Sequence, residues 1–107
     1  MSDDASSGEV VRMWTGWVAT QDREAYARYV TETGIAQYRQ TEGNLDAWLL
    51  LRNLDNDTTE VTTVSRWVSL DAIRAFVGDD VSQAVFYSED DRYLVDRERV
   101  VRHYDRA

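Results

Sequence analysis

Large apolar residues fall on both faces of the first element that the pattern predicts. The row VVRMWTGWV, from Val10 to Val18, has the β-branched and aromatic content of a strand. Side chains alternate between the two faces of a strand, so one face carries Val10, Arg12, Trp14 and Gly16, and the other carries Val11, Met13, Thr15 and Trp17.

The spacing then changes to that of an amphipathic helix. From residue 23 to residue 38, after Thr20 or Asp22 as N-cap, aromatic and apolar residues recur at helical intervals opposite a charged face. The apolar stripe is rich in tyrosine, and we interpret Tyr26, Tyr29 and Tyr38 as its packing residues, with contact between one of their hydroxyls and a substrate as the alternative.

A hairpin and a second helix follow. LDAWLLLRNL, from Leu45 to Leu54, is apolar on both faces at its centre, and the polar turn DNDTT leads into the β-branched strand EVTTVSRWV. Ser69 is then a natural N-cap and Gly78 a C-terminal stop, which predicts a helix from Leu70 to Val77.

The C-terminal quarter predicts shorter elements. A short helix is expected after Asp79 or Asp80, and Ser88 has the capping-box spacing that predicts a helical turn through Leu94. Val100 to Tyr104 alternates as a last strand. The order is therefore β-α-β-β-α-β, which predicts an α+β fold of the ferredoxin-like type, with one antiparallel sheet and helices on one face.

The other face of this sheet needs a cover. The first two strands carry Val, Met, Leu and Trp on both sides, and no segment of the chain is left to cover the second side. We therefore expect a second copy to pack sheet on sheet, which makes the protein a homodimer.

Length and charge narrow the classes of function. The 107 residues fit one domain, expected at residues 9–107 after a disordered acidic tail at residues 1–8, and the absence of cysteine excludes disulfides and thiolate chemistry. Twenty acidic residues face twelve arginines and no lysine, giving a net charge of -8, which argues against nucleic acid and anionic membranes as partners. No apolar run approaches the ~20 residues of a membrane span, so we expect a cytoplasmic protein.

The same composition resembles that of proteins from salt-loving organisms. Molar salt screens repulsion among surface carboxylates, so the sequence predicts weaker folding at low salt. Equal thermal stability in dilute buffer and in molar KCl would contradict this prediction.

The segment TVSRWVSLDAIRAFVGDDVSQAVFYSEDDRYLVDRERVVRHYD, together with MWTGWV, resembles the antibiotic biosynthesis monooxygenase-like family. The resemblance covers about Val10 to Asp105 and implies a dimeric α+β barrel. It also implies several activities, because similar domains include cofactor-free quinol monooxygenases, haem-degrading enzymes and proteins without known activity.

A cofactor-free oxygenation of a quinol or polyketide-like phenol with O2 needs a base, a donor for the oxyanion and a dry aromatic cavity. His103, the only histidine, is the candidate base, with a structural role through a hydrogen bond as the alternative. Arg66 or Tyr104 is the candidate oxyanion donor. The candidate ring-binding residues are Trp14, Trp48, Trp67, Tyr29 and Phe86.

Two other functions stay open. A dimeric module that binds a small aromatic or hydrophobic ligand would need the same aromatic wall without a catalytic group. Haem degradation ranks third, because similar haem-degrading domains place their ligand histidine after the third strand, where this chain has Phe86 and Tyr87. The acidic clusters lack calcium-loop spacing, so we expect neither a metal nor a cofactor.

Overall fold

The computed structural model describes residues 8–107, so the tail predicted at residues 1–8 lies, apart from Gly8, outside the described residues. The elements in chain order are β1 (Val10–Ala19), η1 (Thr20–Asp22), α2 (Arg23–Val30), η2 (Thr31–Ile35), α3 (Ala36–Gln40), β2 (Asn44–Asn53), β3 (Thr58–Trp67), α4 (Leu70–Val77), α5 (Asp90–Tyr93), β4 (Leu94–Arg97) and β5 (Arg102–Asp105).

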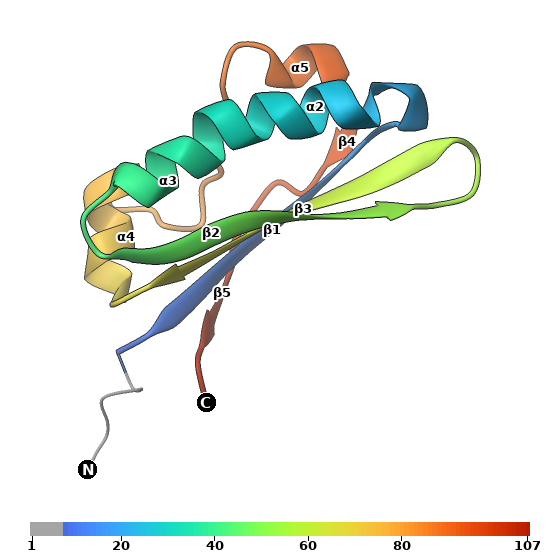
Figure 1. Cartoon of the computed structure of the whole chain (residues 1–107). Coiled ribbons are helices and arrows are strands. Elements are labelled where there is room, and N and C mark those ends of the chain that lie inside the picture. The colour runs from blue at the N-terminus through green and yellow to red at the C-terminus, as the bar shows by residue number, and fades with distance from the viewer. Residues whose placement is uncertain (1–7) are drawn as a thin grey trace.

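The strands form one antiparallel sheet with β1 at its centre. β2 pairs with β3 and β3 with β1, and the two short C-terminal strands share the other edge of β1. β5 lies along Val10–Met13 and β4 along Gly16–Val18. Helices α2, α3 and α5 lie over one face of the sheet (Figure 1). The predicted ferredoxin-like α+β fold is confirmed.

Strand register decides which residues share a face. Arg12 lies opposite Ser65 of β3 and His103 of β5, on the face that the helices cover, which we call the inner face. Its neighbour Met13 lies opposite Val64 and Arg102 on the other, outer face. The alternation predicted for residues 10–18 is therefore confirmed, and it separates two different environments.

The predicted helix at residues 23–38 is present, with a defect in its middle. Its hydrogen-bond pattern widens to that of a π-helix at Thr31–Ile35 before α3 resumes, and the Thr33 hydroxyl donates to the carbonyl of Tyr29 at 2.7 Å. Such π-bulges occur often at functional sites, because the extra residue redirects side chains. Here the bulge brings Thr33 and Gly34 to the wall of an internal cavity.

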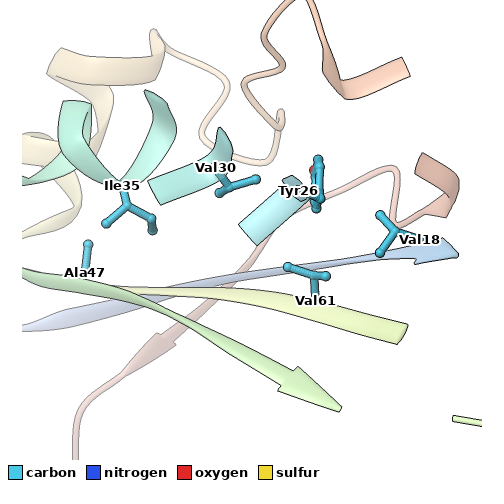
Figure 2. Close-up of a cluster of buried hydrophobic side chains, with 6 residues drawn as sticks. All are labelled: Val18, Tyr26, Val30, Ile35, Ala47 and Val61. Carbon is cyan, nitrogen blue, oxygen red and sulfur yellow. The ribbon is translucent and has the colours of Figure 1, made fainter. Parts of the chain in front are cut away.

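The core lies between this long helix and the inner face of the sheet. Figure 2 shows helix residues Tyr26, Val30 and Ile35 above Val18, Ala47 and Val61 of the sheet. A second buried cluster of Val10, Trp67 and Ile73 anchors α4 on the same face. The Ser69 hydroxyl caps α4 by accepting from Ala72 N, and Gly78 ends it with a φ of 98°, as predicted.

The C-terminal quarter differs from the prediction. No helix follows Asp79, because the carbonyls of Val81 and Gln83 accept hydrogen bonds from Arg12 and do not close helical turns. The helical turn predicted through Leu94 is present as α5, Asp90–Tyr93, but Ser88 does not cap it. Strand β4 was not predicted, and the last strand begins at Arg102, two residues later than expected.

The outer face carries both apolar and charged residues. Leu50 is 51% exposed, and the face also presents Trp17, Trp48, Met13 and Val64. Arg66 pairs with the Glu9 carboxylate, which also pairs with Arg106. These two arginines hold the pKa of Glu9 at about 2, against its ordinary value of 4.5.

Candidate active site

An internal cavity lies between the inner face of the sheet, the long helix and the loop that follows α4. Its volume is about 50 Å³, which exceeds the ~10–15 Å³ that one water needs and falls short of the ~150 Å³ of a cavity that admits benzene. Six aromatic side chains contribute to its wall: Trp14, Tyr26, Tyr38, Phe76, Phe86 and Tyr87. Two charged side chains, Arg12 and Asp90, also line it.

Arg12 is a buried cation, with only 2% of its surface exposed. Its guanidinium donates from Nε to the Tyr38 hydroxyl at 3.0 Å and from Nη2 to the Gln83 carbonyl at 3.0 Å. Nη1 donates to the Val81 carbonyl at 2.7 Å and to Nε2 of His103 at 3.0 Å. All four acceptors are neutral, and within residues 8–107 no carboxylate forms an ion pair with Arg12.

Tyr38 extends this donor group into the cavity. Its ring packs edge-on against Trp67 and Phe76, with ring centroids 5.4 and 5.2 Å away, which fixes the position of the hydroxyl. The hydroxyl oxygen accepts from Arg12, so its own proton is free to donate, and no acceptor for it occurs in the described part of the chain. A ligand oxygen at this point would meet a donor polarised by a neighbouring cation.

Asp90 is the second buried charge at the cavity, at 5% exposure. Its Oδ1 accepts from the Tyr26 hydroxyl at 2.8 Å, and Oδ2 accepts from the backbone N–H of Tyr87 at 2.6 Å. Burial, followed by the charge of Asp90, raises the pKa of Tyr26 strongly, so Tyr26 stays a neutral donor. A carboxylate can accept about four hydrogen bonds, which leaves Asp90 free to accept from a ligand.

His103 lies on the inner face next to Arg12 but does not line the cavity. Because an arginine can only donate, Nε2 of His103 is the acceptor, which makes the imidazole neutral with its proton on Nδ1. Burial and then the charge of Arg12 lower the pKa of His103 below its ordinary 6.5. The lone pair that a general base would use is therefore engaged by Arg12.

The structure separates the predicted ring-binding residues. Trp14 and Phe86 line the cavity, with their rings edge to face at 5.7 Å, and Gly16 leaves room for the Trp14 ring. Trp67 is fully buried in the core, outside the cavity wall, and donates to the Ser65 hydroxyl. Tyr29 also lies outside the wall, where its hydroxyl accepts from the Glu89 N–H.

The two predicted oxyanion donors lie on the outer face, away from the cavity. Strand alternation places Arg66 and Tyr104 opposite Val11 of β1, and Tyr104 is 47% exposed with its hydroxyl accepting from Arg102. The polar residues at the cavity are instead Arg12, Tyr38 and Asp90. A lone charge amid the apolar residues of VVRMWTGWV is a signal that could have singled out Arg12.

Comparison with known proteins supports the fold. No family model and no curated protein matches the chain. Among solved structures, it is similar to a putative antibiotic biosynthesis monooxygenase from Bacillus cereus, with a TM-score of 0.65, 17% identity, and coverage of 94% of this chain and 96% of the other. The chain has the fold of the antibiotic biosynthesis monooxygenase-like proteins.

Two further structures show how widely this fold is used. A conserved protein from Methanosarcina mazei has a TM-score of 0.66 at 14% identity, with coverage of 96% of this chain and 97% of the other. An aldoxime dehydratase matches with a TM-score of 0.54 at 15% identity, and the match covers 73% of this chain and 22% of the dehydratase. A shared fold therefore does not decide the reaction, which depends on the residues at the site.

Two kinds of site have no support in the described residues. Within residues 8–107, no three His, Cys, Asp or Glu side chains come together in a group that could hold a metal ion. In the same range, none of the helices has the length and apolar character needed to cross a membrane.

Proposed function

We propose that the protein is a cofactor-independent monooxygenase that oxidises a small aromatic quinol or polyketide-like phenol with O2. The observation that carries this proposal is the buried Arg12 guanidinium at an aromatic-walled cavity, where it donates to the Tyr38 hydroxyl oxygen and leaves the hydroxyl proton free. Such a donor pair stabilises a phenolate or enolate oxygen, and the low dielectric of a buried site strengthens that effect.

The chemistry begins with removal of a proton. Asp90 accepts a proton from one end of the ring system, and Arg12 with Tyr38 stabilises the negatively charged oxygen at the other end, so electron density moves into the ring. The electron-rich ring then reduces O2 directly. For an anthrone, one oxygen atom becomes the new carbonyl, the other leaves as water, and the substrate supplies both hydrogens and the electrons.

His103 acts in this proposal as a positioning residue. Its neutral imidazole accepts from Arg12, and this bond joins β5 to the donor group. The base role predicted for His103 passes to Asp90, because the Asp90 carboxylate lines the cavity and has unused lone pairs.

The cavity must widen to admit an aromatic ring. The wall that can yield is the loop between α4 and α5, where Val85 and Phe86 are 40% and 42% exposed. Phe86 is held there by the edge of Trp14 and by the Arg97 guanidinium at 4.5 Å from its ring centroid, rather than by a packed core.

Oxygen uptake tests this function. The purified protein in molar KCl is offered a panel of hydroquinones and anthrones, beside the Asp90→Asn, Tyr38→Phe and His103→Ala variants and an exposed control, Arg28→Gln. We expect kcat/KM to fall about 100-fold or more in Asp90→Asn and about 100-fold in Tyr38→Phe, with Arg28→Gln unchanged. A collapse in His103→Ala with full activity in Asp90→Asn would return the base role to His103.

A second candidate function is binding of a small aromatic ligand without catalysis. It is favoured by the bond between Arg12 and His103, which leaves the one histidine with no free lone pair at Nε2. Ligand binding without enzyme-dependent oxygen uptake across the panel would select this function.

The residues do not fit haem. Nε2 of His103 is engaged by Arg12, so it is not presented as an axial ligand. The nearest alternative at the cavity, Tyr87, would have to bind iron as a phenolate, and burial raises its pKa. Haem degradation is therefore not proposed.

We propose further that the protein works as a homodimer that packs outer face on outer face. Leu50, Trp17 and Trp48 lie on a face that no helix of the described chain covers (Figure 1). A shallow groove of about 440 Å³ crosses this face, lined by Met13, Trp17 and Arg102 among others. Sheet-on-sheet packing would bury these apolar groups.

A further inference from the structure

We propose that the cavity selects an aromatic carboxylic acid that also carries a ring hydroxyl, with its carboxylate at Arg12 and Tyr38 and its hydroxyl at Asp90. This inference rests on the site described for the proposed function and names the class of ligand that the site takes. It is carried by the contacts of the two buried charges.

The first step is the count of donors on Arg12. A guanidinium has five N–H groups, and four of them reach Tyr38, Val81, Gln83 and His103. The remaining N–H, on Nη2, has no acceptor within residues 8–107. Together with the free proton of Tyr38, it forms a pair of donors at one wall of the cavity.

The positive charge of Arg12 also favours an anionic ligand. Buried cations are ordinarily paired with an anion, because neutral dipoles compensate the lost hydration only in part. Arg12 is 2% exposed and has only neutral acceptors in the described chain. An anionic ligand would supply the missing partner, and two donors match the two oxygens of a carboxylate.

Asp90 lines the cavity apart from the Arg12–Tyr38 donor pair, and we call its position the other pole of the cavity. Asp90 would repel an anion but accept from a hydroxyl, and Tyr26 and Tyr87 already supply it with one donor on each oxygen. The cavity therefore rejects a group with negative charge at this pole and favours a hydrogen-bond donor. A ring that carries both a carboxylate and a hydroxyl satisfies both ends of the cavity, and the aromatic wall covers its faces.

Calorimetric titration tests the assignment, with the dihydroxybenzoate gentisate as probe. Hydroquinone lacks the carboxylate, and dimethoxybenzoate lacks the hydroxyl donors. We expect gentisate to bind on the order of tenfold tighter than either, since each comparison removes one charge-assisted hydrogen-bonding group.

Variants locate the preference. Tyr38→Phe and Arg12→Lys, which keeps the charge but loses the planar fork, are expected to reduce the advantage of gentisate over hydroquinone to about twofold or less. Asp90→Asn is expected to reduce the advantage over dimethoxybenzoate, and Arg28→Gln to leave both unchanged. Far-UV circular dichroism identifies any variant that fails to fold, and Tyr38→Phe, which loses one hydroxyl, keeps the test decisive if Arg12→Lys does not fold.

The outcomes separate this inference from the proposed function. Equal affinity for gentisate and hydroquinone, absence of gentisate binding, or a preference that survives Tyr38→Phe would overturn the inference. Oxygen uptake with neutral hydroquinones and no preference for gentisate would support the proposed function and refute the aromatic carboxylic acid as ligand. Selective gentisate binding without oxygen uptake would do the reverse.

Discussion

Arg12 and Arg102 lie on neighbouring strands, β1 and β5, but on opposite faces of the same sheet. Arg102, on the outer face, has a side chain 39% exposed and pairs with the Glu98 carboxylate at 3.2 Å. Arg12, on the inner face, is 2% exposed and has four neutral acceptors. Arginine is therefore a partly exposed, ion-paired charge at position 102. At position 12 it is a buried charge whose hydrogen bonds link a strand, a helix and a loop.

The two arginines show that polar groups on the inner and outer faces contribute differently to stability. On the outer face of the single chain, water reaches the Arg102–Glu98 pair, so this ion pair contributes little to the stability of one protomer. On the inner face, the four acceptors of Arg12 are part-buried, so water replaces the lost guanidinium less completely. Removal of Arg12 should therefore cost far more than removal of Arg102.

The largest effect is expected on the stability of a variant that removes the Arg12 guanidinium. Arg12→Met should lower the free energy of unfolding by about 2–5 kcal/mol, because it leaves four part-buried acceptors without a donor, at ~1–3 kcal/mol for each one that water does not reach. Arg102→Met should cost less than about 1 kcal/mol. Urea denaturation in molar KCl measures both, and similar losses in the two variants would mean that the two faces do not differ in this way.

A second variant tests what covers the outer face. Leu50→Asp places a charge on the apolar part of that face, where sheet-on-sheet packing would bury it without a partner. We expect light scattering to give the mass of a dimer for the native chain and of a monomer for Leu50→Asp. Val85→Asp, on the helix-covered side, is the matched control and should remain dimeric. A native chain with monomer mass would refute the homodimer.

A smaller effect is expected on the pKa of His103, which lies beside Arg12 on the inner face. The proton NMR signal of the only histidine should titrate with a pKa below 6.5, since burial and Arg12 disfavour its charged form. Arg12→Met should raise this pKa and Arg102→Met should not. The unfolded chain takes up the proton more readily, so the contribution of His103 to stability is present above pH 6.5 and is lost as the pH falls through 6.5 toward the folded value. A native pKa at or above 6.5 would contradict the hydrogen bond from Arg12.

The smallest effect concerns the outer-face ion pairs of Glu9. Its folded pKa of about 2 lies below the ordinary 4.5, so its contribution to stability is present above pH 4.5 and is lost as the pH falls from 4.5 to about 2. We expect Glu9→Gln to melt a little below the native chain at neutral pH and level with it near the acid end of this window. A difference in melting temperature that does not change with pH would show that the carboxylate is not the cause.

The sequence predicted most of the fold and part of the site. The first strand, the tyrosine-rich helix, the hairpin and the capped helix at Leu70–Val77 were all predicted, because periodicity and capping depend on residues close together in the chain. Trp14 and Phe86 do line the cavity. The short helix expected after Asp79 was wrong, because carbonyls of that segment bind Arg12, which is 69 positions away from Val81.

The sequence by itself determined which residues alternate, so it placed Arg12 with Trp14 on one face and Met13 on the other. Only the tertiary structure decided that this face meets the helices, that Nε2 of His103 accepts from an arginine 91 positions earlier, and that Asp90 is buried in the cavity wall. The physical reason is that strand and helix patterns come from local geometry, whereas a buried polar group takes whichever partner long-range packing brings within hydrogen-bond distance.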